Sequence, residues 1–533
     1  MKQTASTTLF DKVWQQHVIE DLGDGWALLH VDRHLLHDLS GSRSMAELDL
    51  RKLTVPQPQL AYATPDHAVS TAPNRLSDDQ VMQAPQRQRL KSGSASRGIR
   101  FFDLGESGQG IVHVMGPELG IVLPGTTVIC GDSHTCTNGA LGAMAFGVGS
   151  SELTHALATQ TVMQRKPKNM RIRFEGQLPH GVTAKDLILY TIGKLGVSAG
   201  VGHAVEYTGS VIDAMSVEER LTICNLSIEL GAKVGMIAPD QRVFDYLKGR
   251  RFAPQGALFE QALTHWQTLH SDAEAYFDRD ELMNVESVTP MVTWGTSPEQ
   301  VVSVTGVVPA SSVAADQAQR DAWRDARQYI GLDEGQTINS LRVDRVFIGS
   351  CTNSRLSDLR EAAALIKGRR VASHVTAWVV PGSEDVKRAA QNEGLDILFQ
   401  EAGFHWRESG CSMCVAANGD NAGPGERVVS TSNRNFVGRQ GPGARTHLAS
   451  PATAVASAIA RTCARHRGCG ACRPRGDQFR RGQCQPLPPQ LCPGHQPRLC
   501  RFIWRHHARG QRDGDRRRVP REEGAPAPHA RKV

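Results

Sequence analysis

Three cysteines have the residue type and spacing of ligands to an inorganic centre. Cys351 stands in the run Phe347-Ile348-Gly349-Ser350-Cys351-Thr352-Asn353-Ser354, and Cys411 and Cys414 form a CxxC pair in Gly410-Cys411-Ser412-Met413-Cys414. Thiolates group in this way to hold iron–sulfur clusters, and a four-iron cube normally takes four of them. Three thiolates would leave one iron without a protein ligand. Such an open position suits a Lewis-acid catalyst and not an electron carrier.

Cysteines at this spacing can also belong to sites of different kinds. A structural zinc site usually takes four ligands in two close pairs, and residues 1–460 contain one such pair. Radical enzymes that use S-adenosylmethionine also leave one iron open, but their compact CxxxCxxC run is missing. Free cysteines are also common in apolar cores. Spacing therefore leaves both a cluster and plain core cysteines open.

The elements around these residues indicate an α/β protein. A short β-branched run at 126–130 precedes the polar loop Gly131-Asp132-Ser133-His134-Thr135, and 343–348 has the apolar character of a buried strand before Cys351. Open α/β sheets place their chemistry in loops after the carboxyl ends of strands. Further elements are expected as strands at 171–174 and 377–380 and as helices at 217–231 and 355–367, with a looser linker at 285–321.

Length and composition limit the class of protein to which the chain can belong. At 533 residues the chain can hold about three domains, and 40% apolar content with 51 glycines is typical of soluble α/β proteins. The first 24 residues lack the apolar core of a signal peptide, and no apolar stretch approaches the roughly 18 residues of a membrane span. Twelve cysteines in such a chain indicate metal binding or burial rather than a disulfide framework. We expect a cytoplasmic protein.

Charge is unevenly distributed along the chain. The net charge is +7, yet residues 461–533 hold 18 Lys/Arg against 5 Asp/Glu, a net +13, whereas residues 1–460 carry −6. The segment 461–533 is rich in Arg, Pro, Gly, Cys and His and has no helix or strand period, so we predict that it is disordered. Its charge would attract nucleic acid, and Cys469 with Cys472 would make half a zinc site. However, Cys484, Cys492 and Cys500 offer no second CxxC, so we do not expect nucleic acid as a partner.

Longer runs around the candidate residues resemble the signature motifs of the aconitase superfamily. In chain order these are Asp66-His67, Gly110-Ile111-Val112-His113, Gly131-Asp132-Ser133-His134-Thr135, Ile348 to Ser354, the Cys411/Cys414 pair and Ser432-Asn433-Arg434-Asn435-Phe436-Val437-Gly438-Arg439. Three more runs, Val31 to His37, Tyr62 to His67 and Val112 to Glu118, are similar to the large-subunit family of bacterial 3-isopropylmalate dehydratases. The resemblance extends in order from about residue 8 to about residue 460.

The resemblance implies a fold and a reaction. The fold would be three α/β/α domains of aconitase type around a central cluster cleft, at 1–167, 168–290 and 291–460, with the cluster cysteines in the third. The reaction would be that of a hydro-lyase of leucine biosynthesis, which interconverts 2-isopropylmalate and 3-isopropylmalate by dehydration and rehydration. The cofactor would be one [4Fe-4S] cluster per subunit, held by Cys351, Cys411 and Cys414 with one iron open.

Residue roles follow from the resemblance as hypotheses. His67 with Asp66, and His134 with Asp132, would form acid pairs, and the other candidates for catalysis are His113 and Glu229. Carboxylates stabilise imidazolium in such pairs. Substrate contacts would come from Ser133, Asn225, Arg434 and Arg439, and Asn433 would contact the cluster. Asn225 is expected one helical turn before Glu229 on the same face.

Each of these residues also has an ordinary structural role. A single His is more often a surface or hydrogen-bonded core residue, a Glu on a helix is usually a solvated charge, and Asp132 with Ser133 makes a good helix cap. Only their joint occurrence favours catalysis.

The chain departs from the family pattern at two places. Nothing after residue 460 resembles the swivelling fourth domain of single-chain aconitases, so the resemblance implies a separate small subunit that supplies the serine base and further arginines. The segment 461–533 exceeds the family pattern and is either a basic appendage or an out-of-frame extension. The alternative functions are a relative acting on homocitrate or citramalate, and an aconitase-like RNA-binding regulator.

Overall fold

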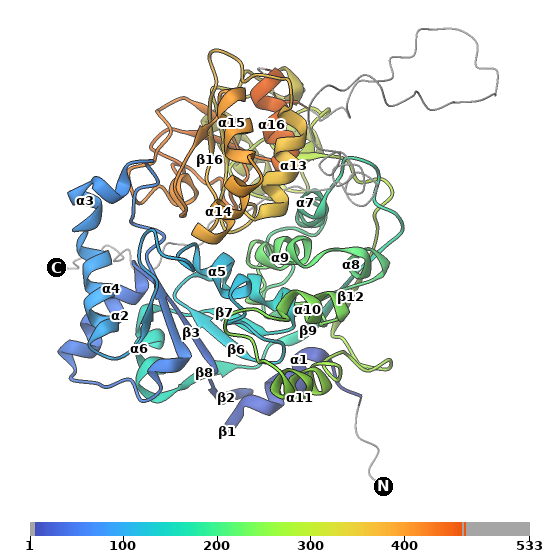
Figure 1. Cartoon of the computed structure of the whole chain (residues 1–533). Helices are drawn as coiled ribbons and strands as arrows, with labels where there is room; N and C mark the ends of the chain where they lie inside the picture. Colours follow the sequence, from blue (N-terminus) through green and yellow to red (C-terminus); the bar gives the residue numbers. More distant parts are fainter. Residues whose placement is uncertain (1–5, 461–462, 465–533) are drawn as a thin grey trace, which may run out of the picture.

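The structure is a computed structural model, and it describes residues 6–460, 463 and 464. Three parallel β-sheets covered by helices make up most of the described chain (Figure 1). The helices are α1 (Leu9–His17), α2 (Ser40–Leu50), α3 (Asp79–Met82), α4 (Pro85–Ala95), α5 (Val112–Glu118), α6 (Ser150–Thr159), α7 (Ala184–Leu195), α8 (Ser210–Ala214), α9 (Val217–Asn225), α10 (Gln241–Leu247), α11 (Ala257–Trp266), α12 (Gln317–Ile330), α13 (Leu356–Ile366), α14 (Glu384–Asn392), α15 (Leu395–Ala402) and α16 (Pro451–Ala460).

The first sheet has five parallel strands in the order β5-β4-β3-β6-β7. They are β3 (Arg33–His37), β4 (Ala61–Thr64), β5 (Arg100–Phe101), β6 (Thr127–Cys130) and β7 (Met144–Gly147). Every residue of β4 and β6 is buried, as expected for parallel strands covered on both faces. A smaller antiparallel sheet, β1 (Val18–Gly23), β2 (Trp26–His30) and β8 (Thr161–Arg165), lies beside it.

The second sheet is also parallel, in the order β11-β10-β9-β12. Its strands are β9 (Lys168–Glu175), β10 (His203–Thr208), β11 (Val234–Met236) and β12 (Arg279–Asn284). Capping boxes start two helices that connect strands of this sheet: Thr183 with Asp186 begins α7, between β9 and β10, and Ser216 with Glu219 begins α9, between β10 and β11.

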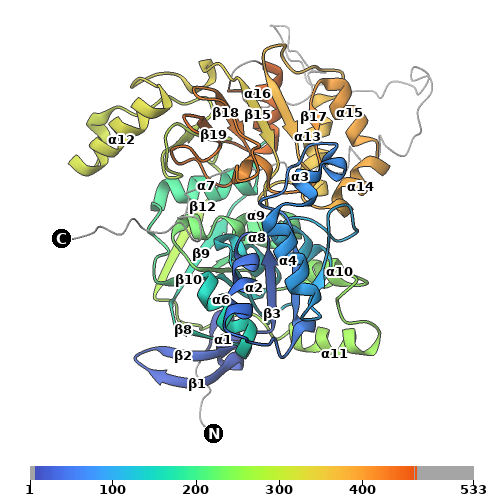
Figure 2. The same ribbon diagram turned by 90° about the vertical axis from the view of Figure 1, so that its left-hand side faces the viewer.

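The third sheet has the order β17-β16-β15-β18-β19, again all parallel. Its strands are β15 (Arg345–Ile348), β16 (Thr376–Val379), β17 (His405–Trp406), β18 (Arg427–Ser430) and β19 (Arg445–Leu448). A short antiparallel pair, β13 (Met291–Thr293) and β14 (Val301–Ser303), and the projecting helix α12 precede it in the chain (Figure 2).

The apolar core is divided in two. One cluster of buried side chains runs through the first and second sheets, and a second cluster fills the third sheet and its helices. The third unit lies above the other two in Figure 1, with α5, α9 and α14 near the junction. The mixed α/β class with parallel sheets is confirmed, whereas the domain limits remain predictions. The segment 461–533 lies outside the described residues apart from 463 and 464.

One helix prediction is wrong in part. The helix expected at 217–231 ends at Asn225, and a separate 3₁₀ turn, Ile228–Leu230, carries Glu229. Asn225 and Glu229 therefore do not share a helix face. The last turn of α9 is built of weak helix formers, and Ser227 uses its hydroxyl to hydrogen-bond Tyr207 (2.9 Å). The linker expected at 285–321 also contains β13, β14 and the start of α12.

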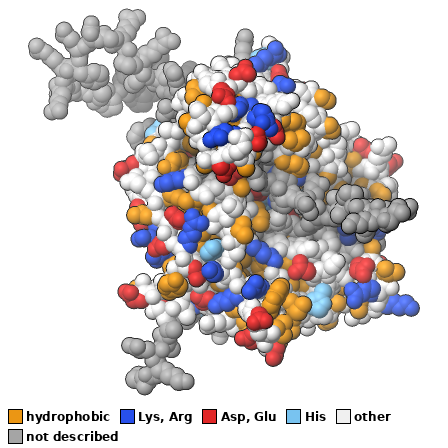
Figure 3. All heavy atoms as spheres, turned by 180° about the vertical axis from the view of Figure 1, so that it is seen from behind, with side chains coloured by type: hydrophobic (Ala, Val, Ile, Leu, Met, Phe, Trp, Pro, Cys, Tyr) orange, Lys and Arg blue, Asp and Glu red, His pale blue; other side chains and the backbone are white. Residues whose placement is uncertain are grey.

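The charged side chains on the surface of the described residues are of both signs. On the face shown in Figure 3, basic and acidic side chains are interspersed. Among residues 6–464 as far as the structure describes them, none of the helices combines the length and apolar character that a bilayer span requires.

Candidate functional site

The candidate site lies where carboxyl ends of the first and third sheets meet. Asp38, Asp66 and Asp132 follow the neighbouring strands β3, β4 and β6 of the first sheet, and Cys351 follows β15 of the third. A backbone hydrogen bond from Cys411 N to Asp66 O (2.8 Å) joins the two units directly. This is the edge at which parallel α/β sheets concentrate polar loops.

The three candidate cysteines differ in exposure from the buried cysteines of the first two units. Cys351, Cys411 and Cys414 form no disulfide and keep 5%, 4% and 5% of their surface exposed, whereas those other cysteines keep none. These three residues are therefore buried but keep a small accessible surface. Ser350 (φ 83°) and Ser412 (φ 50°) hold left-handed backbone conformations beside them, which cost of order 1–3 kcal/mol each and are typical of functional loops.

Polar side chains lie beside the sulfurs of Cys351 and Cys414. Asn225 Nδ2 and Asn433 Nδ2 each donate to Cys351 Sγ at 3.2 Å. Cys414 Sγ lies 3.1 Å from Ser350 Oγ and 3.4 Å from Asn433 Oδ1. Amide donors aimed at a sulfur stabilise a thiolate and tune any metal centre that it binds.

The thiols need a cationic partner to ionise. Burial, and then the neighbouring Cys414, raise the pKa of Cys351 to about 12, and burial raises the pKa of Cys411 well above its usual value. A metal ion supplies the charge that offsets these effects. Three buried, unbridged sulfurs, with two amide donors on Cys351 and the His67 ring beside Cys411, fit a metal centre that takes three thiolates.

Asp132 is a shared acceptor for three histidines. Its Oδ2 accepts from His67 Nε2 at 3.2 Å, and its Oδ1 lies 3.3 Å from His134 Nδ1 and 3.6 Å from His113 Nε2. Burial alone would raise the pKa of Asp132, but the hydrogen bonds from the three histidines outweigh burial and hold that pKa well below its usual range. Asp132 also caps the 3₁₀ turn Ser133–Leu141, since Oδ1 accepts from His134 N at 2.6 Å.

His67 lies between two carboxylates. Its Nδ1 contacts Asp66 Oδ1 and lies 3.8 Å from Cys411 Sγ, while its Nε2 faces Asp132. Burial would lower the pKa of His67, but Asp66, Cys411 and Asp132 together raise it well above its usual value. The other oxygen of Asp66 accepts from Val112 N at 3.0 Å, which fixes the carboxylate. An imidazolium in this position can serve as a proton donor.

Glu229 connects all three units. Its Oε1 accepts from His134 Nε2 at 2.8 Å and from Arg434 Nε at 3.0 Å, and Arg434 Nη2 contacts Ser133 Oγ. Glu229, His134 and Arg434 are buried, and Ser133 is half-buried. Arg439 lies in the same loop as Arg434, with its guanidinium carbon 5.8 Å from the centre of the Phe436 ring. These contacts join the predicted site residues into two groups, one around Asp132 and one around Cys351 and Cys414.

Some residues that position this network were not predicted from the sequence. Asp38 is fully buried and accepts from His67 N (3.0 Å) and Ala68 N (2.8 Å), so it fixes the loop that carries Asp66 and His67. It directly follows β3, and the carboxyl-end rule could have found it. Arg355 joins Thr352 O (3.0 Å) to His113 O (3.2 Å).

A group of possible cation ligands lies next to the site. The ligand atoms of His37, Asp38, Asp66 and His67 lie within 4.8 Å of one another. The loop N–H groups and the His67 ring already occupy the two carboxylates, and the His37 ring packs on His67 with centroids 4.2 Å apart. These contacts explain the grouping without an ion.

Sequence comparison with known proteins agrees with this geometry. The sequence model of the Aconitase family (aconitate hydratase) matches residues 11–461, which confirms the predicted aconitase-type fold. The chain is 59% identical over 459 residues to the 3-isopropylmalate dehydratase large subunit 1 of Bradyrhizobium diazoefficiens, and the alignment covers 86% of this chain and 95% of that protein. The crystal structure of holo aconitase X from Thermococcus kodakaraensis aligns with a TM-score of 0.41 at 11% identity, over 76% of this chain and 83% of that one.

Proposed function

Because the chain belongs to the aconitase family, we propose that it is the large subunit of a 3-isopropylmalate dehydratase, a hydro-lyase of leucine biosynthesis in the cytoplasm. The observation that carries the proposal is the 59% identity to such a subunit over nearly its whole length. The joined network of Asp132, three histidines and Glu229 beside three available thiols supports it. The same residues suit dehydration of a hydroxy diacid.

The cysteine site suits an iron–sulfur cluster. Cys351, Cys411 and Cys414 would hold a [4Fe-4S] cluster, which supplies an open Lewis-acid position for a substrate hydroxyl when it is bound. Asn225 and Asn433 orient Cys351 and stabilise its thiolate through their 3.2 Å hydrogen bonds.

The chain supplies the acid side of the reaction. Hydroxide leaves poorly unless it is protonated, and His67 carries a proton whose retention Asp66 and Asp132 favour. His134 and His113 share the second carboxylate, so a proton lost by His67 can be replaced within the buried network. Arg434 and Ser133 are suited to binding a substrate carboxylate. In this structure the Arg434 guanidinium contacts the carboxylate of Glu229 and the hydroxyl of Ser133.

A separate small subunit completes the proposed enzyme. The name of the 59% identical relative, a large subunit, supports such a partner. By family resemblance, the partner would bring the serine base that removes the carbon-bound proton and further arginines that bind carboxylate. The large subunit alone should therefore bind its cluster but not turn over.

Reconstitution tests the proposal. The full chain is purified without air, mixed with the small subunit that pairs with the Bradyrhizobium relative, and given 3-isopropylmalate while ultraviolet absorbance reports the unsaturated diacid. We expect turnover only with both subunits, and faster turnover than with citramalate or homocitrate. Preference for another diacid would move the assignment to a related hydro-lyase. No turnover on any diacid by an iron-replete complex would contradict the proposal.

A further inference from the structure

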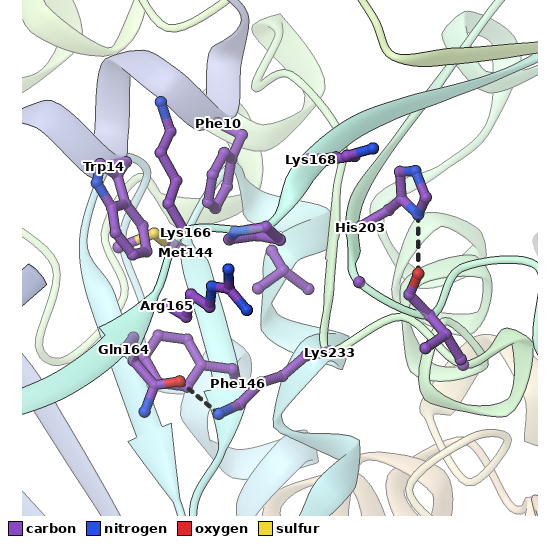
Figure 4. Close-up of a pocket in the computed structure, with 15 residues that line it drawn as sticks. Phe10, Trp14, Met144, Phe146, Gln164, Arg165, Lys166, Lys168, His203 and Lys233 are labelled. Carbon is purple, nitrogen blue, oxygen red and sulfur yellow. Dashed lines mark hydrogen bonds between the residues drawn. The ribbon is translucent and has the colours of Figure 1, made fainter. Parts of the chain in front are cut away.

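A second concave site lies at the opposite edge of the sheets from the cysteines. It is a groove of about 590 Å³ lined by residues of α1, β7, β8 and the starts of β9, β10 and β11 (Figure 4). Met144, Lys168 and His203 are the first residues of their strands, whereas Asp132 and Cys351 follow strand ends. The groove shares no residue with the candidate site, so the proposed dehydration leaves it unexplained.

The floor of the groove is apolar and aromatic. Phe10 and Trp14 of α1 pack with ring centroids 5.6 Å apart, and Met144 and Phe146 of β7 complete the surface. These four residues are at most 6% exposed, so they support the groove from below, and the accessible apolar surface comes mainly from Val201, which is 61% exposed. Such a surface favours a ligand with a flat or branched apolar body.

The rim of the groove is cationic. Arg165, Lys166, Lys168 and Lys233 line it together with His203, and none of its lining residues is acidic. Figure 4 shows Arg165 lying between the aromatic residues of α1 and Lys233. A concave surface with charges of one sign and apolar walls concentrates ions of the opposite sign.

The four rim cations differ in how they are paired. Lys166 Nζ pairs with Asp11 Oδ1 at 2.6 Å, and Lys233 Nζ donates to Gln164 Oε1 at 2.6 Å. Within the part of the chain that the structure describes, the side chains of Arg165 and Lys168 form neither a hydrogen bond nor an ion pair. Their charges are therefore available to a ligand.

We propose that this groove binds a small organic anion, a carboxylate, sulfonate or phosphate ester with an aromatic or branched apolar group. The apolar group packs on Val201 and on the accessible edge of Trp14, and the anionic group binds Arg165 and Lys168. The volume is in the range of ligand pockets, about 300–1,000 Å³, and a few placed charges on an apolar wall are typical of such sites.

A fluorescent probe tests the inference on the full-length protein. 8-Anilinonaphthalene-1-sulfonate carries an aromatic body and one anionic group, and its neutral counterpart N-phenyl-1-naphthylamine lacks the anion. We expect the sulfonate to bind more tightly than the neutral probe, and binding to weaken as salt rises from about 20 mM to about 500 mM. Hydrogen exchange should slow at residues 164–168 and 201–203 when the sulfonate is bound.

Paired variants separate this groove from other surfaces. Arg165→Gln with Lys168→Gln should weaken sulfonate binding about tenfold, because two unpaired cations are lost, and leave the neutral probe unaffected. The matched control is Lys52→Gln with Lys248→Gln, which removes two exposed cations outside the groove and should change nothing. Equal affinity of the parent and the groove variant for the sulfonate, or no binding by the parent, would overturn the inference.

Discussion

Replacing Asp132 by Asn should uncouple the histidine network while preserving its shape. The asparagine side chain is isosteric with the native carboxylate, and its oxygen can keep the 2.6 Å cap bond to His134 N. Its amide nitrogen then stands where Oδ2 accepted from His67 Nε2 at 3.2 Å, so two N–H donors face each other. The proton on His67 loses one of its two carboxylate supports, and the pKa of His67 falls.

The size of the effect follows from the lost interactions. A hydrogen bond to a charged group contributes about 1.5–3 kcal/mol, and the 3.3 Å and 3.6 Å contacts with His134 and His113 lose their electrostatic attraction as well. A loss of about 3 kcal/mol from the transition state corresponds to roughly a hundredfold lower kcat. Iron content should stay at the parental value, because none of the cysteines is changed.

The assay is turnover of 3-isopropylmalate by the reconstituted complex, read with iron content and melting temperature. The matched control is Asp103→Asn, since Asp103 also accepts charged donors, from Arg87 (2.7 Å) and Lys91 (2.8 Å), but lies outside the site. The control should lower the melting temperature and leave kcat unchanged. A kcat within about threefold of the parent for Asp132→Asn, at equal iron content, would refute the acid role of this network.

Two further predictions concern stability. Asp32 pairs with His17 at 2.7 Å. Burial would raise the pKa of Asp32, but His17 and Thr127 lower this pKa to about 2. Burial would lower the pKa of His17, but Asp32 raises it. The Asp32 carboxylate therefore stabilises the fold above about pH 4, and the His17 imidazolium stabilises it below about pH 6.5. Asp32→Asn should lower the free energy of unfolding in urea by about 2 kcal/mol at pH 5.5, where both groups are charged, and by less at pH 9. Equal costs at both pH values would exclude the pair as the cause. Gly139→Ala should destabilise by about 3 kcal/mol, because its new methyl would lie 1.8 Å from Gly235 O, whereas Gly149→Ala, with 3.6 Å to its nearest neighbour, should be tolerated. Parental unfolding midpoints for both glycine variants would contradict this packing.

The elements that the sequence predicted best are those set by local pattern. The apolar runs before Gly131 and Cys351 form β6 and β15, because a short β-branched run followed by a polar loop has few other low-energy arrangements. The three cysteines were singled out from spacing and flanking residues, and contacts of Cys411 with Asp66 and His67 and of Cys351 with Asn225 link them to the first two units. Which atoms each histidine meets could not be read from such patterns.

The parts that could not be predicted depend on contacts between distant segments. Lys185 looks like an ordinary helix charge, yet it is fully buried and donates to Thr431 O and Ser432 O from another unit. Glu229 was expected on a helix, but it lies in a separate 3₁₀ turn that follows Ser227, whose hydroxyl is hydrogen-bonded to Tyr207. Tertiary hydrogen bonds of this kind override local helix preference, and no periodicity in the chain records them.

The most direct test of the proposed centre is the iron and acid-labile sulfide content of freshly purified, air-free protein. The parent should carry about four of each per chain, and Cys351→Ser should lose most of both while keeping its circular dichroism spectrum. Cys463→Ser, which changes a buried cysteine outside the site, should match the parent. An iron-free parent that still dehydrates 3-isopropylmalate with its partner, or full iron and activity in Cys351→Ser, would contradict the central claim that three thiolates hold the catalytic centre.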